Sequence, residues 1–417
     1  MTSGWAHRLR RWGPTALAVA ATLIVWLGPF RHYARWTDVG LTDIPTYEES
    51  AGATAAGRLP YRDIELEYPP GAALVFYLAR FLPGGNYTDQ FRLLMLIAWT
   101  VASAGGVAAS TVLRLGLARQ AAVGAIMAAT PVLLGSLLAT RYDGLVTAVM
   151  AWMLVAAVAE RWRWMWGLLV AAILLKLMPV VLVPSLALWQ WHRAGAMVTK
   201  CALAGAGLAT AAVVAPFAIV APHGLWGMLA YHLRRPAQIE SSASSYLLAW
   251  HLVADVPVTI ATQFGSQGPV GWVPTVLATA SSIAGVAAVA LLLVGYARRL
   301  RALPKAQTGR GSLVTTVAAT IVVLAVGSKV LSPQYLLWMM PAALLLPGPR
   351  GRLALTLLPV VMLLTQWYFP KHYWELVALD AFPIIVLCAR NLLLLVLAVL
   401  CWPRLESQAA RQVERLS

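Results

Sequence analysis

Long apolar runs recur along almost the whole chain, and they constrain its fold more than any other feature. Runs of about 18 or more apolar residues are long enough to cross the hydrocarbon core of a bilayer as helices. Backbone groups in lipid must be hydrogen-bonded within the protein, and runs of this length favour α-helices over barrel strands. Only 12% of the residues are charged, against roughly 25% in soluble domains. We therefore expect an all-α polytopic membrane protein.

Basic clusters between the apolar runs predict how the chain is oriented in the cell membrane. Arg8, Arg10 and Arg11 precede the first run, residues 14–30, so we expect the chain to begin in the cytoplasm with an uncleaved signal anchor. Alternating sides from there predicts roughly 11 to 12 transmembrane passes with both termini in the cytoplasm. The expected organisation is a single helical transmembrane domain over residues 1–402 and a cytoplasmic tail over residues 403–417.

Two weaker segments decide this count. Residues 164–191 are interrupted by the sequence Lys176-Leu177-Met178-Pro179, and the basic clusters on either side require the run to go out and return with Lys176 near the turn. Residues 247–264 form a weak apolar run that we expect to stay outside or to be re-entrant. A full span there would invalidate the argument that residues 164–191 go out and return.

Residues 41–77 are the only long polar passage before the C-terminal tail. The first loop, residues 31–70, is expected to be extracytoplasmic and to carry the site. Asp43 is an isolated carboxylate just past the first span, and Tyr47, four residues later, would share its face on a helix. Two interpretations remain open. Asp43 or Thr42 could cap a helix that ends at Gly57, or Asp43 could be a general base that takes a proton from an acceptor hydroxyl.

Carboxylates concentrate on the predicted outer side, as expected for a polar working face. Of the 16 Asp and Glu residues, the segments expected to be cytoplasmic hold only Glu160, Glu406 and Glu414. Two ionisable residues, Arg141 and Asp143, lie together at an outer span end. They are either a structural or snorkelling ion pair or part of a binding pocket.

Further cations lie at predicted outer positions, where the orientation rule does not favour them. Residues 231–241 contain His232, Arg234 and Arg235, followed by Gln238 and Glu240. Guanidinium groups bind phosphate in a bidentate way, which favours a phosphate site. The alternative is an interfacial helix that is salt-bridged through Glu240.

Two lysines are also expected near outer span ends. Lys329 precedes Ser332, Pro333, Gln334 and Tyr335, and Lys176 lies near the predicted turn. Ionisable groups at membrane depth are costly and by default indicate function.

Several function classes lack their usual sequence marks. The chain has no phosphate-cradling glycine loop, no H-E-x-x-H, no nucleophile elbow and no Asp-x-Asp, so we expect no metal and no cofactor. The net charge of +16 comes from clusters typical of cytoplasmic loops, so we expect no nucleic-acid partner. The three cysteines lie in apolar runs without C-x-x-C spacing, which predicts small core residues rather than disulfides.

The order and spacing of the outer motifs resemble the glycosyltransferase C superfamily, and within it family 87, which includes phosphatidylinositol mannoside mannosyltransferases. The resemblance rests on these stretches: Thr42-Asp43-Ile44-Pro45-Thr46-Tyr47, Gly57-x-x-Pro60-Tyr61-x-Asp63, Glu67-Tyr68-Pro69-Pro70-Gly71-Ala72, Lys176-Leu177-Met178-Pro179 and Ser332-Pro333-Gln334-Tyr335-Leu336-Leu337-Trp338.

The resemblance implies a helical membrane fold whose extracytoplasmic first loop carries a catalytic Asp, which Asp43 matches. It implies an inverting, metal-independent transfer of a sugar, expected to be mannose, from a polyprenyl-phosphate donor to a hydroxyl of a lipid or cell-envelope glycan. Donor, acceptor and membrane lipids would be the partners. The donor phosphate would then contact His232, Arg234, Arg235 and Lys329. The expected substrate pocket comprises Tyr47, Glu67, Tyr68, Arg141, Asp143, Lys176, Gln238, Glu240, Gln334 and Tyr335.

Two other function classes compete with this interpretation. A transporter or flippase for a lipid-linked sugar would also use broken helices such as that at Met178-Pro179. It would be expected to show paired repeats and ionisable residues near the bilayer midplane, whereas the repeats are not evident and the charges cluster at one face. An accessory scaffold without activity would leave the outer carboxylates and cations unexplained.

Overall fold

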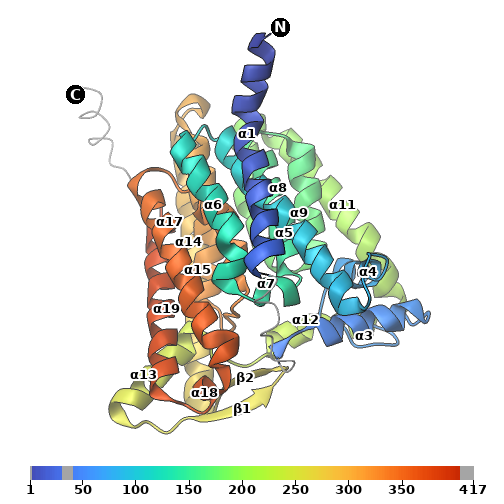
Figure 1. Ribbon diagram of the computed structural model, residues 1–417, viewed down its shortest axis with the longest axis vertical. Coiled ribbons are helices and arrows are strands. Elements are labelled where there is room, and N and C mark those ends of the chain that lie inside the picture. Colours follow the sequence, from blue (N-terminus) through green and yellow to red (C-terminus); the bar gives the residue numbers. More distant parts are fainter. Residues whose placement is uncertain (1, 31–40, 404–417) are drawn as a thin grey trace.

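The computed structural model describes residues 2–30 and 41–403. The predicted cytoplasmic tail beyond residue 403 and residues 31–40 of the first loop lie outside the described part of the chain. Long helices pack into a bundle, as Figure 1 shows, and within the described residues eight are long and apolar enough to cross a membrane. They are α1 (Thr2–Val25, continued by η1, Trp26–Phe30), α5 (Tyr87–Val112), α6 (Leu117–Leu134), α11 (Ala196–Val220), α14 (Trp272–Ala302), α15 (Arg310–Gly327), α17 (Gly348–Gln366, continued by η6, Trp367–Lys371) and α19 (Ala381–Cys401). The prediction of an all-α polytopic membrane protein is confirmed at this level.

The remaining expected passes correspond to shorter helices. These are α8 (Asp143–Val158), α9 (Trp162–Leu175), α10 (Val183–Ala194) and α16 (Tyr335–Ala343), joined in places by α7 (Leu137–Thr140), η4 (Met178–Leu182) and η5 (Lys305–Gln307). At about 1.5 Å per residue, a helix of roughly 16 residues or fewer does not reach across a 30 Å hydrocarbon core. The count of passes therefore stays a prediction beyond the eight long helices.

The predicted turn at Lys176 is present. Helix α9 ends at Leu175, Lys176 has extended backbone, and the chain continues through η4 into α10. The indole nitrogen of Trp166, near the start of α9, donates a 2.5 Å hydrogen bond to Oε1 of Gln190, near the end of α10. The two helices therefore run in opposite directions, which is what the basic clusters required.

The weak apolar run at residues 247–264 does not form a spanning helix. Helix α13 (Ser242–Ala254) ends within it, and an antiparallel hairpin of β1 (Thr259–Gln263) and β2 (Ser266–Val270) follows, with Thr259 opposite Val270. The sequence interpretation missed this hairpin. Its turn residues, Phe264 and Gly265, both have positive φ, at 51° and 65°, which matches the twist that a two-residue hairpin needs.

Small residues let the long helices approach closely, as is common in membrane bundles. A Cβ added at Gly327 of α15 would lie 2.7 Å from Cα of Gly285 on α14. A Cβ added at Gly105 of α5 would lie 2.9 Å from Cβ of Ala151 on α8. These contacts hold α14 closely against α15 and α5 closely against α8.

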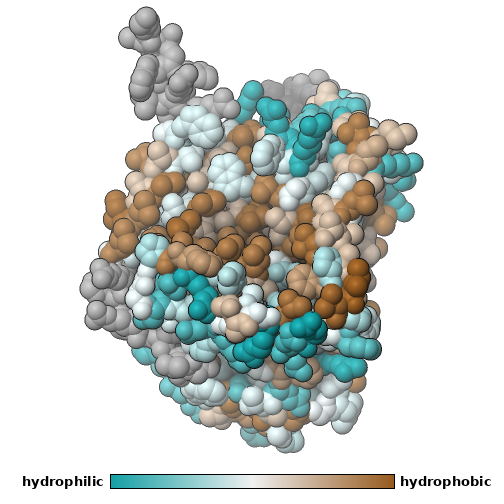
Figure 2. Space-filling model, turned by 90° about the vertical axis from the view of Figure 1, so that its right-hand side faces the viewer, coloured by the Kyte–Doolittle hydropathy of each residue, from teal (hydrophilic) through white to brown (hydrophobic). Residues whose placement is uncertain are grey.

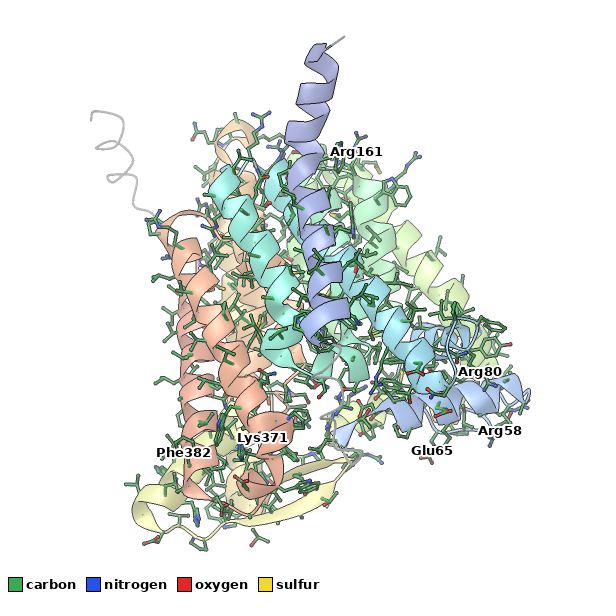
Figure 3. All side chains as sticks on the ribbon, viewed as in Figure 1. Arg58, Glu65, Arg80, Arg161, Lys371 and Phe382 are labelled. Carbon is green, nitrogen blue, oxygen red and sulfur yellow. The ribbon has the colours of Figure 1, made fainter. Side chains whose placement is uncertain are left out.

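The segments predicted to be cytoplasmic meet at one end of the bundle. Arg193 pairs with Glu160 at 2.6 Å and donates to the carbonyl of Lys305 at 2.8 Å, while Arg350 donates to the carbonyl of Trp402 at 2.6 Å. The start of α1 and the last turns of α19 lie at this end (Figure 1). Figure 3 places Arg161 here, away from Glu65 and Lys371 at the other end.

The opposite end carries the outer loops of the prediction. It is built from α3 (Ile44–Ala55), α4 (Pro70–Ala79), α12 (Pro222–Arg234), α13, α18 (Tyr373–Val377) and the strand pair, as Figure 1 shows. On the face shown in Figure 2, hydrophobic residues form a broad zone, with hydrophilic residues gathered below it and others near the top. Such a band is what a bilayer would cover.

Candidate functional site

Helix α3 positions the first functional side chain. It begins after Asp43, with Pro45 in its first turn, and Gly57 ends it in a left-handed conformation at φ 79°. The amide of Arg58 bonds to the carbonyl of Ala53 at 3.0 Å, and the amide of Gly57 to that of Thr54 at 3.1 Å. This is a Schellman ending, so the predicted helix that stops at Gly57 is confirmed.

The Asp43 carboxylate does not cap this helix. Asp43 occupies the N-cap position without a side-chain capping bond, and Oγ1 of Thr42 instead accepts from the amide of Ile44 at 3.2 Å. The Tyr47 hydroxyl donates to Oδ2 of Asp43 at 3.1 Å, and Oδ1 pairs with Nη1 of Arg141. The Asp43 side chain is 33% exposed. The capping interpretation of this carboxylate is therefore wrong, because its oxygens face side chains and not the first-turn amides.

Arg141 and Asp143 do not pair with each other, which corrects the expectation of a local ion pair. Arg141 has extended backbone after α7, whereas Asp143 already belongs to α8, so their side chains diverge. Arg141 forms an ion pair with Asp43, and its Nη2 donates a 2.8 Å hydrogen bond to the carbonyl of Leu41. Burial lowers the pKa of Arg141 to about 10, so the guanidinium stays charged at neutral pH.

Asp143 pairs with Lys176 instead. Its Oδ1 lies 2.7 Å from the Lys176 ammonium, and the Asp143 side chain is only 1% exposed. The same ammonium lies 4.8 Å from the ring centre of Tyr142 and 5.0 Å from that of Trp338, within cation–π range. Because the helix is interrupted between α9 and η4, the Lys176 side chain contacts the buried Asp143 carboxylate and the rings of Tyr142 and Trp338.

An aromatic cluster supports Asp43 and Lys176 from the interior. The ring of Tyr47 stacks on Phe76 of α4 at 4.3 Å, and the rings of Tyr68 and Tyr142 meet edge-on at 5.3 Å. Burial raises the pKa of Tyr47 and of Tyr68 well above the usual value, so both hydroxyls stay protonated. Tyr47 is therefore a hydrogen-bond donor to Asp43 at neutral pH.

The predicted phosphate-binding residues gather where α12 ends. Nε2 of His232 lies 3.0 Å from the carbonyl of Glu67, and the Lys329 ammonium donates to the carbonyl of Leu233 at 2.7 Å. Burial lowers the pKa of His232, which favours its neutral form. Arg234 is exposed, whereas the partly buried Arg235 guanidinium lies 6.0 Å from the ring of Tyr231.

The segment beyond α12 is irregular and buried, so the interpretation as an interfacial helix salt-bridged through Glu240 is wrong there. The amide of Gln238 donates to the carbonyl of Lys329 at 2.9 Å, and the Ser332 hydroxyl donates to Oε1 of Gln238 at 2.9 Å. Glu240 is 1% exposed. Burial raises its pKa to about 7, although Arg390, Arg235 and Arg141 act in the opposite direction.

The sequence interpretation missed Arg390 and Asn391. Arg390 is fully buried and donates from Nη1 to Oδ1 of Asn391 at 2.6 Å and from Nε to the Thr365 hydroxyl at 3.3 Å. The Asn391 amide donates to the carbonyl of Glu240 at 3.1 Å. The signal was available, because an arginine inside the last apolar run is an ionisable group at membrane depth.

The remaining predicted pocket residues lie around these groups. Glu67 is partly buried, and its charge adds to the burial that raises the pKa of Tyr231. Gln334 is partly buried just before α16, and the ring of Tyr335 stacks on Trp338 at 3.9 Å. Among the described residues, no group of three or more His, Cys, Asp or Glu could hold a metal ion.

Two ion pairs therefore share this end of the bundle, one partly exposed between Asp43 and Arg141 and one buried between Asp143 and Lys176. Donors and cations from α12 and from the loop before α16 lie beside them. The arrangement offers a carboxylate for proton transfer and cations for an anionic group. The chain matches no protein-family profile and no curated protein.

Proposed function

We propose that the chain is an inverting membrane glycosyltransferase that uses a polyprenyl-phosphate sugar as donor and Asp43 as general base. The observation that supports it best is the state of Asp43: a carboxylate one-third exposed, without a capping role, and oriented by Tyr47 and Arg141. A base must be held in place and must still be reachable by the acceptor. We place this end of the bundle on the extracytoplasmic side, following the basic clusters.

The proposed reaction is a single displacement. Asp43 takes the proton of the acceptor hydroxyl, and the acceptor oxygen forms a bond to the anomeric carbon of the sugar. The bond between that carbon and the phosphate oxygen breaks, and the lipid phosphate leaves with the electron pair. Cations beside the leaving oxygen would stabilise its charge.

Lys329 and His232 suit the phosphate role because their present partners are neutral. Both contact backbone carbonyls, of Leu233 and Glu67 respectively, and neither contacts a carboxylate in a described ion pair. A hydrogen bond in which a partner is charged is about twice as strong as a neutral one, so a phosphate can displace either carbonyl. No carboxylate would lose its cation in that exchange. Burial lowers the pKa of Lys329, and the positive charge of Arg235 lowers it further. We therefore expect both cations to act on the same phosphate.

A second function, transport of a lipid-linked sugar, is favoured by two specific observations. Arg390 is fully buried inside α19, and Lys176 pairs with Asp143 where α9 is broken. Ionisable groups at depth beside interrupted helices are also found in transporters. The two functions differ in whether the sugar leaves its lipid.

The deciding experiment is sugar transfer by the purified chain from polyprenyl-phosphate-mannose to a membrane lipid extract, with EDTA present. Asp43→Asn keeps the size of the side chain but cannot take a proton, so we expect transfer to fall by about 10²- to 10⁴-fold. Glu49→Gln, an exposed change on the same helix, should keep the wild-type rate. Equal rates in wild type and Asp43→Asn would remove Asp43 as the base. Movement of the intact donor across vesicles without transfer would establish the transporter.

A further inference from the structure

Lys329 lies in the irregular loop that joins α15 to α16, and this loop is held by two different partners. Helix α14 holds its start, where the Ser281 hydroxyl donates to the carbonyl of Gly327 at 2.9 Å. The amide of Lys329 donates to the Ser282 hydroxyl of the same helix at 3.2 Å. From the Lys329 carbonyl onward, the loop is hydrogen-bonded to Gln238, in the segment between α12 and α13.

Gln238 contacts the loop at two points. Its amide donates to the carbonyl of Lys329 at 2.9 Å, and its side-chain Oε1 accepts from the hydroxyl of Ser332, 94 residues away in the chain, at 2.9 Å. Gln238 and Ser332 are each 5% exposed. A hydrogen bond in such a buried place is stronger than one in water, and removing one partner leaves the other unsatisfied. The two contacts therefore fix the backbone on both sides of the turn that follows Lys329.

The segment that carries Gln238 is itself fixed. The Ser244 hydroxyl, in the first turn of α13, donates to the carbonyl of Gln238 at 2.8 Å, and this turn is capped by Ser241. On the other side, β2 lies directly against the preceding residue, since a Cβ added at Gly268 would overlap the carbonyl oxygen of Ala237. A residue held between α13 and β2 can determine where an irregular loop lies.

This arrangement places the Lys329 ammonium at the end of α12. It donates to the carbonyl of Leu233 at 2.7 Å, one of the last-turn carbonyls that a helix cannot satisfy internally. The helix dipole also favours a cation there. His232, on the same turn, contacts the carbonyl of Glu67 at 3.0 Å. One proposed phosphate ligand thus belongs to α12, whereas the other reaches α12 from a separate loop.

We propose that Gln238 is a positioning residue for Lys329. Through its amide and through Ser332, it holds the loop so that the ammonium stays beside the last turn of α12. A phosphate that approaches this turn then binds a cation that is already in place, and a preorganised group costs less to immobilise. The effect on binding rests on the proposed function, in which Lys329 contacts the donor phosphate. The placement of the ammonium is a property of the protein without substrate.

The test measures how fast acetic anhydride acetylates Lys329 in the purified full-length chain, by mass spectrometry of its peptides. Ser332→Ala removes the hydroxyl, and Gln238→Met removes the polar end of the side chain while keeping its length. Lys329 is partly buried and hydrogen-bonded in the wild type. Each variant loosens the loop, so we expect Lys329 to react about two- to tenfold faster, the change that one hydrogen bond produces.

Two controls make the measurement specific. Lys371, an exposed lysine of another loop, is the internal reference and should react at the same rate in every variant. Ser312→Ala is the matched control, because it removes a serine hydroxyl that donates to the carbonyl of Gly309 at 2.8 Å, at the other end of α15. Lys329 should react in this variant as in the wild type.

The two test variants remove the same hydrogen bond, so their effects should not add. We expect the double variant to react no faster than the faster single variant. A Lys329 rate at or below that of the wild type in folded Ser332→Ala would overturn the positioning, whether or not Gln238→Met folds. Multiplied rates in the double variant would also overturn it, because the two residues would then act separately.

Binding of farnesyl phosphate, a short prenyl phosphate, separates this proposal from the proposed function. If Lys329→Ala binds it as tightly as the wild type, the phosphate role of Lys329 fails and the acetylation result stands by itself. If Lys329→Ala weakens binding and Ser332→Ala does not, the positioning fails and the phosphate role stands. With both correct, Ser332→Ala raises the Kd about two- to tenfold and raises the KM for the donor. Ser312→Ala should change neither.

Discussion

The Tyr47 hydroxyl donates a 3.1 Å hydrogen bond to the Asp43 carboxylate one helical turn before it, while the Tyr47 side chain is 1% exposed. The ring is anchored on Phe76 of α4 at 4.3 Å. A buried ring thus holds a partly exposed carboxylate, so the position of the proposed base depends on the packing of α3 against α4.

Tyr47→Phe separates this hydrogen bond from the packing. The variant should lose about 0.5–1.5 kcal/mol of unfolding free energy, the usual net contribution of one hydrogen bond. Tyr47→Ala also empties the aromatic cluster and should lose about 3–5 kcal/mol. Denaturant unfolding in detergent measures both. Equal losses in the two variants would show that the hydroxyl, and not the ring, carries the stability.

Lys176→Met should be strongly destabilising, because it leaves the buried Asp143 carboxylate without its cation. Breaking a buried pair from one side costs about 3–5 kcal/mol. The double variant Lys176→Met with Asp143→Asn removes the stranded charge and should regain part of that loss. A double-mutant cycle on unfolding free energies measures the coupling. A single variant as stable as wild type would mean that water reaches Asp143.

Gly224→Ala tests how closely α12 packs against the first loop. A Cβ at this position would overlap the carbonyl oxygen of Tyr61, so the backbone of one segment must move. We expect a loss of about 1–3 kcal/mol, as for other overpacked contacts, together with weaker donor binding, because His232 lies on the same helix. Gly227→Ala is the matched control, since nothing lies within 4 Å of its Cβ. Equal stability of both variants would contradict the close packing.

The pH dependence of the unfolding free energy should report the protonation of Glu240. Its pKa is raised from 4.5 to about 7 by burial, so the folded protein binds a proton that the unfolded chain has released. This contribution to stability is fully present below pH 4.5 and is lost as the pH rises through about 7. Between pH 4.5 and about 7, the melting temperature of the wild type should fall as the pH rises, and that of Glu240→Gln should fall less. Parallel curves for the two proteins would exclude Glu240 as the source.

Local patterns in the sequence predicted much of this architecture. Apolar runs predicted the long helices, because a segment in lipid must satisfy its own backbone. Basic clusters predicted that residues 164–191 turn near Lys176, and the turn is present. The four-residue spacing of Asp43 and Tyr47 predicted that they share a helix face, and they are hydrogen-bonded. Each of these inferences depends only on residues near one another in the chain.

The partners of the ionisable groups depended on the tertiary structure. Arg141 and Asp143 are two residues apart, yet Arg141 pairs with Asp43 and Asp143 pairs with Lys176. Asn391 is 151 residues from Glu240 in the chain, yet its side chain donates to the Glu240 carbonyl. Arg390, the residue before it, is thereby brought near Glu240. Sequence alone therefore determined a helical membrane protein with charged residues between its apolar runs. Only the packing of distant segments decided which charges meet, because an ion pair forms where side chains converge in space and hydropathy carries no information about that convergence.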